Sequence, residues 1–152
     1  MYYNMGKIAP DSLNSVYDKN VAYRYLPSLK NYPLPINIAL PIYSWGIHIR
    51  DGKIIGLRNK IDIDNLKNNS SFVLTKNNWF TVKNSIFREG IYYKKNDQIK
   101  IETISENDLL EMADNLAENT IQNPKEIIFY DLDEFNLKKY DTALFKKIIN
   151  CF

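Results

Sequence analysis

Two aspartates separated by one residue follow an apolar segment near the end of the chain, in EIIFYDLDEF. In an extended segment Asp131 and Asp133 share one face, whereas Glu134 follows directly and points to the other face. Paired carboxylates act as acid and base, or as nucleophile, in hydrolytic reactions. A small aspartate-dependent hydrolase is therefore one hypothesis for this chain. The alternative is that these charged residues only open the loop that follows a strand.

A second group of residues suits binding without catalysis. Asn4, Tyr43, Trp45 and Asp131 each lie at the end of a segment that is predicted to be a strand. If those strands are parallel, their carboxyl ends meet at one edge of the sheet, where α/β folds place their sites. Aromatic rings stack on the apolar face of a sugar, and amide and carboxylate groups orient its hydroxyls. We therefore predict that these four residues bind a glycan; the alternative is that Tyr43 and Trp45 are wedged between the parallel strands and the hairpin that follows.

Several other kinds of site are not expected. His48 is the sole histidine and Cys151 the sole cysteine, which argues against a zinc centre and against a nucleophile–histidine pair. The five glycines form no phosphate-binding loop. The segment that starts at Asp62 carries Leu66 and Lys67 where a calcium loop needs a ligand and a glycine. We therefore predict no metal and no cofactor.

Composition limits the class of partner. The 152 residues include 20 Lys+Arg and 18 Asp+Glu, and this net charge of +2 argues against binding to nucleic acid. No apolar run approaches the roughly 18 residues that a membrane span requires, and the first residues lack the pattern of a signal peptide. The apolar share of 45% suits a single domain with a substantial core.

Two kinds of strand are predicted. Residues 36–43 (INIALPIY) and 126–131 (EIIFYD) are apolar at both odd and even positions, which is typical of strands covered on both faces. Between about residues 46 and 104 the pattern changes to short alternating strands, and Asp51-Gly52 is typical of a two-residue hairpin turn. Helices are expected after three N-cap residues, namely Asp18, Ser105 and Asp141.

Outside the β-rich segment, strands and helices alternate, which favours parallel strands joined by right-handed crossovers. We therefore predict an α/β fold, the C-terminal portion of a (β/α)8-like barrel with about three parallel strands, one of them at Tyr2-Tyr3. Within a single domain spanning 1–152, residues 1–45 and 105–152 would form the barrel-like part. Residues 46–104 would form an inserted β-rich α+β subdomain, which leaves 36–43 and 126–131 as parallel neighbours.

The order of the motifs YYNMG, INIALPIYSWG, RDGKIIGL, IYYKKNDQIKIE and IIFYDLDEFNLKKY resembles the C-terminal part of uncharacterised bacterial TIM-barrel-like proteins, often lipoproteins. These proteins are distantly similar to glycoside hydrolase family 18. In chitinase-like barrels one late strand reads M-x-Y-D/N and the next reads G-L-P-x-Y-G. The residues that resemble these two motifs are Met1, Tyr3 and Asn4, followed by Ala39, Leu40, Pro41, Tyr43 and Gly46.

This resemblance implies a role in carbohydrate binding and a cell-envelope location for a longer protein. The strand D-x-x-D-x-D-x-E, which carries the catalytic acid of that family, is absent and would lie upstream of residue 1. We therefore expect a non-catalytic or incomplete carbohydrate-binding fragment of a glycoside-hydrolase-like barrel, with a glycan, the missing N-terminal portion or a second copy as partner. The alternative is a protein-interaction module in which the β-rich insertion presents the binding surface.

Overall fold

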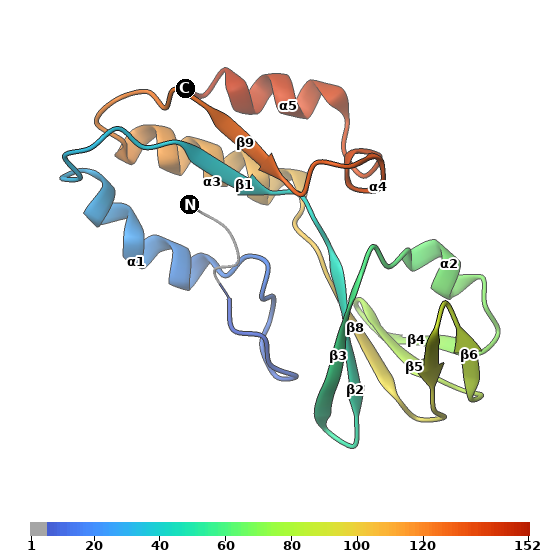
Figure 1. Ribbon diagram of the computed structural model, residues 1–152. Coiled ribbons are helices and arrows are strands. Elements are labelled where there is room, and N and C mark those ends of the chain that lie inside the picture. The colour runs from blue at the N-terminus through green and yellow to red at the C-terminus, as the bar shows by residue number, and fades with distance from the viewer. Residues whose placement is uncertain (1–5) are drawn as a thin grey trace. The chain divides into compact units, whose positions relative to one another are not determined.

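The computed structural model describes residues 6–152, which fold into two compact units (Figure 1). The helical unit comprises residues 6–7, Leu13–Tyr43 and Thr103–Phe152, and the sheet unit comprises Ile8–Ser12 and Ser44–Glu102. The strand predicted at Tyr2-Tyr3 and the site residue Asn4 lie outside the described residues.

The helical unit contains a pair of parallel strands. β1 and β9 pair in register from Ile38 with Ile127 to Pro41 with Tyr130, so the predicted parallel pairing of 36–43 with 126–131 is confirmed. β1 is buried throughout, whereas β9 leaves Ile128 and Tyr130 exposed. The elements of this unit are α1 (Lys19–Leu29), β1 (Ile38–Pro41), α3 (Glu106–Asn119), β9 (Ile127–Tyr130), α4 (Glu134–Leu137) and α5 (Thr142–Ile149).

Three helices of this unit begin where the sequence predicts. The side chains of Asp18, Ser105 and Asp141 each accept a hydrogen bond from a backbone N–H in the first turn of α1, α3 or α5. Each cap satisfies N–H groups that have no partner inside the helix. Within residues 6–152, no helix has the length and apolar character needed to cross a membrane.

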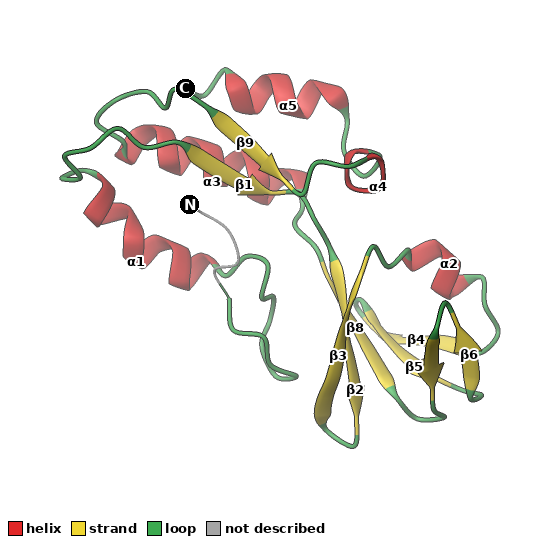
Figure 2. Cartoon of the chain, viewed as in Figure 1, coloured by secondary structure: helices red, strands yellow, loops and turns green. Residues whose placement is uncertain are grey.

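The sheet unit is built on an antiparallel sheet of five strands in the order β3-β2-β8-β5-β4 (Figure 2). The hairpin β6-β7 forms a separate two-stranded sheet. The elements are β2 (Trp45–Arg50), β3 (Lys53–Asn59), α2 (Ile63–Lys67), β4 (Phe72–Lys76), β5 (Trp79–Val82), β6 (Ile86–Arg88), β7 (Ile91–Tyr93) and β8 (Gln98–Glu102).

Alternation along the strands places the core of the sheet unit on one face. Phe80 and Val82 of β5 and Ile99 and Ile101 of β8 are almost fully buried and belong to one apolar cluster. The remaining buried members of this cluster are Leu66, Phe72 and Tyr93. These three residues come from α2, β4 and β7, so the segments around the sheet complete the core that the sheet alone leaves open.

The predicted fold class, a portion of a (β/α)8-like barrel with about three parallel strands, is wrong. The largest sheet is antiparallel, and the parallel pairing among residues 6–152 is limited to β1 with β9. The apolar pattern of 126–131 predicted a strand covered on both faces, but β9 leaves Ile128 and Tyr130 exposed, and such a pattern does not show how many strands lie beside it. The parallel pair is therefore real, whereas the barrel inferred from it is not.

The turn between β2 and β3 provides a direct test of the hairpin. Asp51 and Gly52 have φ of 49° and 74°, which confirms the predicted turn with positive φ at both central residues. A Cβ added at Gly52 would meet no atom within 4 Å. A larger residue at this position would therefore lower the stability only through the strain of its backbone conformation.

We expect Gly52→Val to lower the free energy of unfolding by about 1–2 kcal/mol, measured by urea denaturation. Asn tolerates positive φ, so Gly52→Asn should lower the free energy of unfolding by less than half as much as Gly52→Val. Equal losses in the two variants would contradict the role of positive φ in this turn.

Candidate functional site

The residues predicted to bind a glycan do not form one described cluster. In the helical unit, the Tyr43 ring packs edge-to-face against Tyr130 with 5.9 Å between ring centroids, and exposed Asp131 follows Tyr130 directly. Trp45 belongs to the sheet unit, where its indole N–H donates to Glu102 Oε2 at 3.1 Å. The structure thus places Tyr43 against Tyr130, the residue before Asp131 in the chain, and sequence reasoning missed Tyr130.

The second aspartate of the DLDE motif has a local structural role. Asp133 is the N-cap of α4, and its Oδ1 accepts the backbone N–H of Asn136 at 2.8 Å. Asn136 in turn donates through Nδ2 to the backbone oxygen of Asp131 at 3.0 Å. Asp131 and Asp133 are therefore both held by the hydrogen bonds that begin a short helix, and this structural role explains their spacing.

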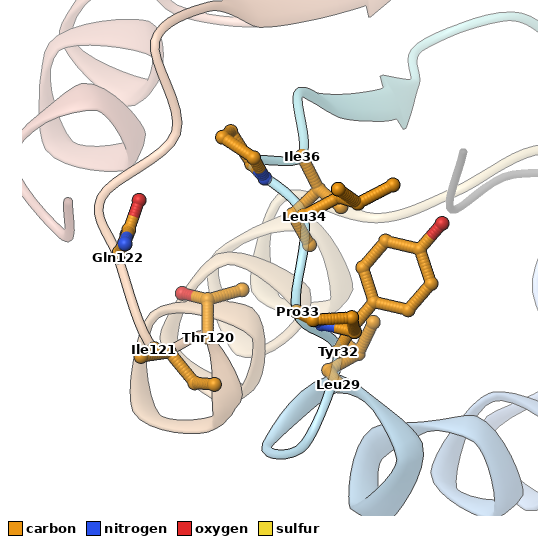
Figure 3. A pocket seen from close by; sticks show the side chains of 9 residues that line it. Leu29, Tyr32, Pro33, Leu34, Ile36, Thr120, Ile121 and Gln122 are labelled. Carbon is orange, nitrogen blue, oxygen red and sulfur yellow. The ribbon is translucent and has the colours of Figure 1, made fainter.

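Two hollows differ greatly in size. The pocket in the helical unit has a volume of about 70 Å³ and lies between the loop after α1 and the loop after α3, where Tyr32, Leu34 and Ile121 line it (Figure 3). The pocket in the sheet unit has a volume of about 310 Å³. Ligand sites usually begin at roughly 300 Å³, so the pocket of the sheet unit is the candidate site.

The pocket of the sheet unit combines an apolar wall with charged groups. Its apolar wall includes Phe72, Ile91 and Tyr93. The Tyr93 ring packs against Phe72 edge-to-face, with 5.4 Å between centroids, and so both rings are held in place. The polar lining comprises Arg58, Asn59, Lys60, Asp62, Asn65, Arg88 and Glu89.

The acidic residues of the pocket lining already have partners. Asp62 is the N-cap of α2, where its Oδ1 accepts the backbone N–H of Asp64 at 2.8 Å. Glu89 pairs with Arg88 at 3.1 Å between Oε1 and Nε. Arg58 differs from these residues, because its buried Nε has no hydrogen-bond partner among residues 6–152. The pocket therefore contains a cation with an unused donor.

A buried network lies behind Arg58. Arg58 Nη2 lies 3.2 Å from His48 Nδ1, and His48 Nε2 lies 2.8 Å from Asp97 Oδ2. Asp97 also accepts from both Arg50 Nε and Arg50 Nη2, at 2.8 and 2.7 Å, and from the backbone N–H of Lys94 at 2.8 Å. The series Asp97–His48–Arg58 thus runs from the buried turn before β8 to the pocket.

The two neighbours of His48 determine its tautomer. A guanidinium can only donate, so Nδ1 must carry the lone pair; a carboxylate can only accept, so Nε2 must carry the proton. His48 is 0% exposed, and its ring stacks on Tyr93 with 4.9 Å between centroids. Both ring nitrogens are therefore engaged, which leaves His48 no role as a general base toward a ligand.

Burial and neighbouring charges alter the acidity of this network. Burial lowers the pKa of His48 below its ordinary 6.5, and Arg58 and Arg50 act in the same direction, while Asp97 opposes them. Burial alone would raise the pKa of Asp97, but hydrogen bonds from Arg50, Lys94 and His48 lower it from 3.8 to about 2. Both groups therefore bind a proton less readily in the folded chain, and stability falls on acidification, below pH 6.5 through His48 and below 3.8 through Asp97.

Gly56 makes room for the Arg58 guanidinium. A Cβ built at Gly56 would lie 2.9 Å from Arg58 Nη1 and 3.1 Å from Nη2. Gly56 faces His48 across the β2–β3 ladder, so the position without a side chain lies beside the imidazole that Arg58 contacts. The absence of a side chain at this position thus allows the guanidinium to lie over the strand.

The sequence analysis predicted short alternating strands around the Asp51-Gly52 turn and did not identify this network. The structure corrects the interpretation: Ile47, His48 and Ile49 are all buried, so both faces of β2 are covered. The only hint of the network in the sequence was the pair His48 and Arg50, which lie two residues apart on the strand before the Asp51-Gly52 turn. That pattern does not show which acid would join them, because Asp97 lies 49 residues from His48.

Comparisons with protein-family models, with curated protein sequences and with solved structures found no match to this chain. Within the described residues, no group of three or more His, Cys, Asp or Glu side chains could hold a metal ion. The resemblance to barrel-like bacterial proteins stays a prediction. The chemistry of the pocket is therefore the basis for the functional assignment.

Asp97 should be important for the stability of the sheet unit. We expect Asp97→Asn to lower the free energy of unfolding by about 3 kcal/mol, because it leaves the buried donors of Arg50 and His48 without a carboxylate. Chemical denaturation at neutral pH measures this loss. The matched control Asp64→Asn removes an aspartate whose side chain is 81% exposed, and it should change stability by less than about 0.5 kcal/mol. A similar small loss for Asp97→Asn would show that the network is not stabilising.

Proposed function

We propose that this chain is a non-catalytic binding module whose sheet unit takes a carboxylate-bearing ligand with an apolar body. The observation that carries the proposal is the Arg58 guanidinium, which lines the pocket and keeps a buried Nε without a partner in residues 6–152. Hydrogen bonds from a guanidinium to a carboxylate are short and strong, and their two-pronged geometry orients the ligand.

The surroundings of Arg58 favour an anion over a cation. The nearby carboxylates of Asp62 and Glu89 are engaged as a helix cap and in a pair with Arg88. Lys60 adds a further positive charge to the lining. A ligand carboxylate would therefore meet an unused donor at Arg58 Nε, whereas a cation would have to displace existing contacts.

The apolar wall selects what the carboxylate is attached to. Phe72 and Tyr93 are nearly fully buried and make their edge-to-face contact within the core cluster, and Ile91 packs against that cluster. A pocket of about 310 Å³ suits a small aromatic or branched aliphatic acid, or the acidic side chain of a peptide. The peptide source corresponds to a protein-interaction module, and the free acid corresponds to a small-molecule receptor.

Binding of benzoate, followed by NMR chemical shifts, tests this proposal. We expect Arg58→Gln to weaken binding by at least about tenfold, because a hydrogen bond to a charged group is lost. Gly56→Ala keeps the charge but pushes the guanidinium aside, and should also weaken binding. Arg24→Gln, the same change at an exposed position of α1, should have no effect.

Two further probes identify the source of the carboxylate. Benzamide, the neutral counterpart of benzoate, should not bind measurably if the charge is required. A short peptide with blocked ends and a single glutamate represents a partner protein, and tighter binding of this peptide than of benzoate would favour the interaction module. Equal binding of benzoate and benzamide, or full affinity in Arg58→Gln, would contradict the proposal.

A second candidate function is glycan binding by the helical unit. The observation that favours it is the edge-to-face pair of Tyr43 and Tyr130, with Tyr130 half exposed at 50% and Asp131 next to it. An exposed ring next to a carboxylate offers stacking together with directional hydrogen bonds. This proposal needs neither the barrel nor the acid that the sequence lacks.

A glycan array followed by titration of any oligosaccharide that binds tests this second candidate. We expect Tyr130→Ala to weaken binding about tenfold, in the range of a lost aromatic contact, and Asp131→Asn to weaken it less. Tyr92→Ala is the matched control, because Tyr92 is a similarly exposed tyrosine in the other unit. Equal losses from Tyr130→Ala and Tyr92→Ala would contradict a site at Tyr130.

A further inference from the structure

The network behind the pocket joins the proposed ligand-binding arginine to the sole histidine of the chain. Arg58 Nη2 donates to His48 Nδ1 across 3.2 Å, and the other side of the imidazole is held by Asp97 at 2.8 Å. His48 itself has no access to solvent. It therefore acts on the pocket through Arg58 and not by touching a ligand.

We infer that His48 is the positioning residue of the carboxylate site and that its protonation strengthens ligand binding. The inference rests on the proposed function of the pocket in the sheet unit. The neutral imidazole holds one N–H of Arg58 through its Nδ1 lone pair. The imidazolium carries an N–H at Nδ1 in place of the lone pair, so it no longer accepts from Arg58 and frees Nη2 for the carboxylate.

Around His48, the neighbouring groups keep a constant charge while the imidazole titrates. Arg50 on β2 and Arg58 on β3 stay protonated, and the pKa of Asp97, at about 2, keeps that carboxylate ionised. Tyr93 on β7 stays neutral, because burial raises its pKa above 10. Between about pH 5 and 8, the change of charge within this network therefore falls on His48.

The sign of the effect follows from electrostatics. A carboxylate bound at Arg58 lies close to His48, and an added positive charge on His48 attracts it. By reciprocity, the bound carboxylate must favour the protonated imidazole by the same factor. The affinity for a carboxylate should therefore rise as the pH falls, on the order of 5–10-fold across the titration of His48.

Because His48 is the sole histidine, its imidazole signals in a two-dimensional NMR spectrum can be followed without assignment of other residues. We would titrate the full chain with acid in the absence and presence of benzoate, and repeat both titrations with Arg58→Gln. Without benzoate, we expect the neutral imidazole of His48 to carry its proton on Nε2. The midpoint of its titration should lie below pH 6.5 in the wild-type chain and should be higher in Arg58→Gln. With benzoate, the midpoint of the wild-type chain should rise, whereas that of Arg58→Gln should not.

A second measurement separates positioning from a merely structural role. We expect benzoate affinity to rise on acidification in the wild-type chain and to stay flat in His48→Gln once the titration of benzoate itself is subtracted. A midpoint that Arg58→Gln leaves unchanged, or an affinity that is independent of pH in the wild-type chain, would overturn the inference while leaving binding at neutral pH intact. Failure of benzoate to bind at any pH, in a chain whose His48 still responds to Arg58→Gln, would instead overturn the proposed function and with it this inference.

Discussion

Asp97 is 2% exposed, and a charge so removed from water is tolerated only when donors replace the water that it loses. Asp97 obtains these donors from Arg50, His48 and the backbone of Lys94. They come from β2 and from the turn between β7 and β8, so satisfying one carboxylate joins segments that are distant in the chain. The pairing of β2 with β8 places these segments side by side.

The orientation of the pocket cation depends on this carboxylate. Asp97 holds the proton of His48 on Nε2, and the lone pair then left on Nδ1 accepts from Arg58. Gly56 leaves room for the guanidinium beside this contact. A second buried ion pair, Lys100 with Glu102 at 2.6 Å, lies on the same sheet, and its glutamate also accepts from the Trp45 indole. The antiparallel sheet thus carries buried charges that are each paired or hydrogen-bonded.

Local features of this chain could be predicted, because they depend on residues close together in sequence. The caps at Asp18, Ser105 and Asp141 need only a side-chain oxygen near free N–H groups. The turn at Asp51-Gly52 needs only two residues that accept positive φ. The barrel was a wrong prediction because the number of strands beside 36–43 depends on contacts that no local pattern encodes.

The helix starts, the hairpin and the existence of two apolar strands can be predicted from the sequence, since each follows from backbone chemistry within a few residues. Folding decided that His48 is buried, because alternation along β2 is the same whether its second face meets water or protein. It also decided that Asp97 and Arg58 meet His48 from 49 and 10 residues away. The candidate site depends on these non-local contacts, since only folding brings the pocket arginine, the histidine and the buried carboxylate together.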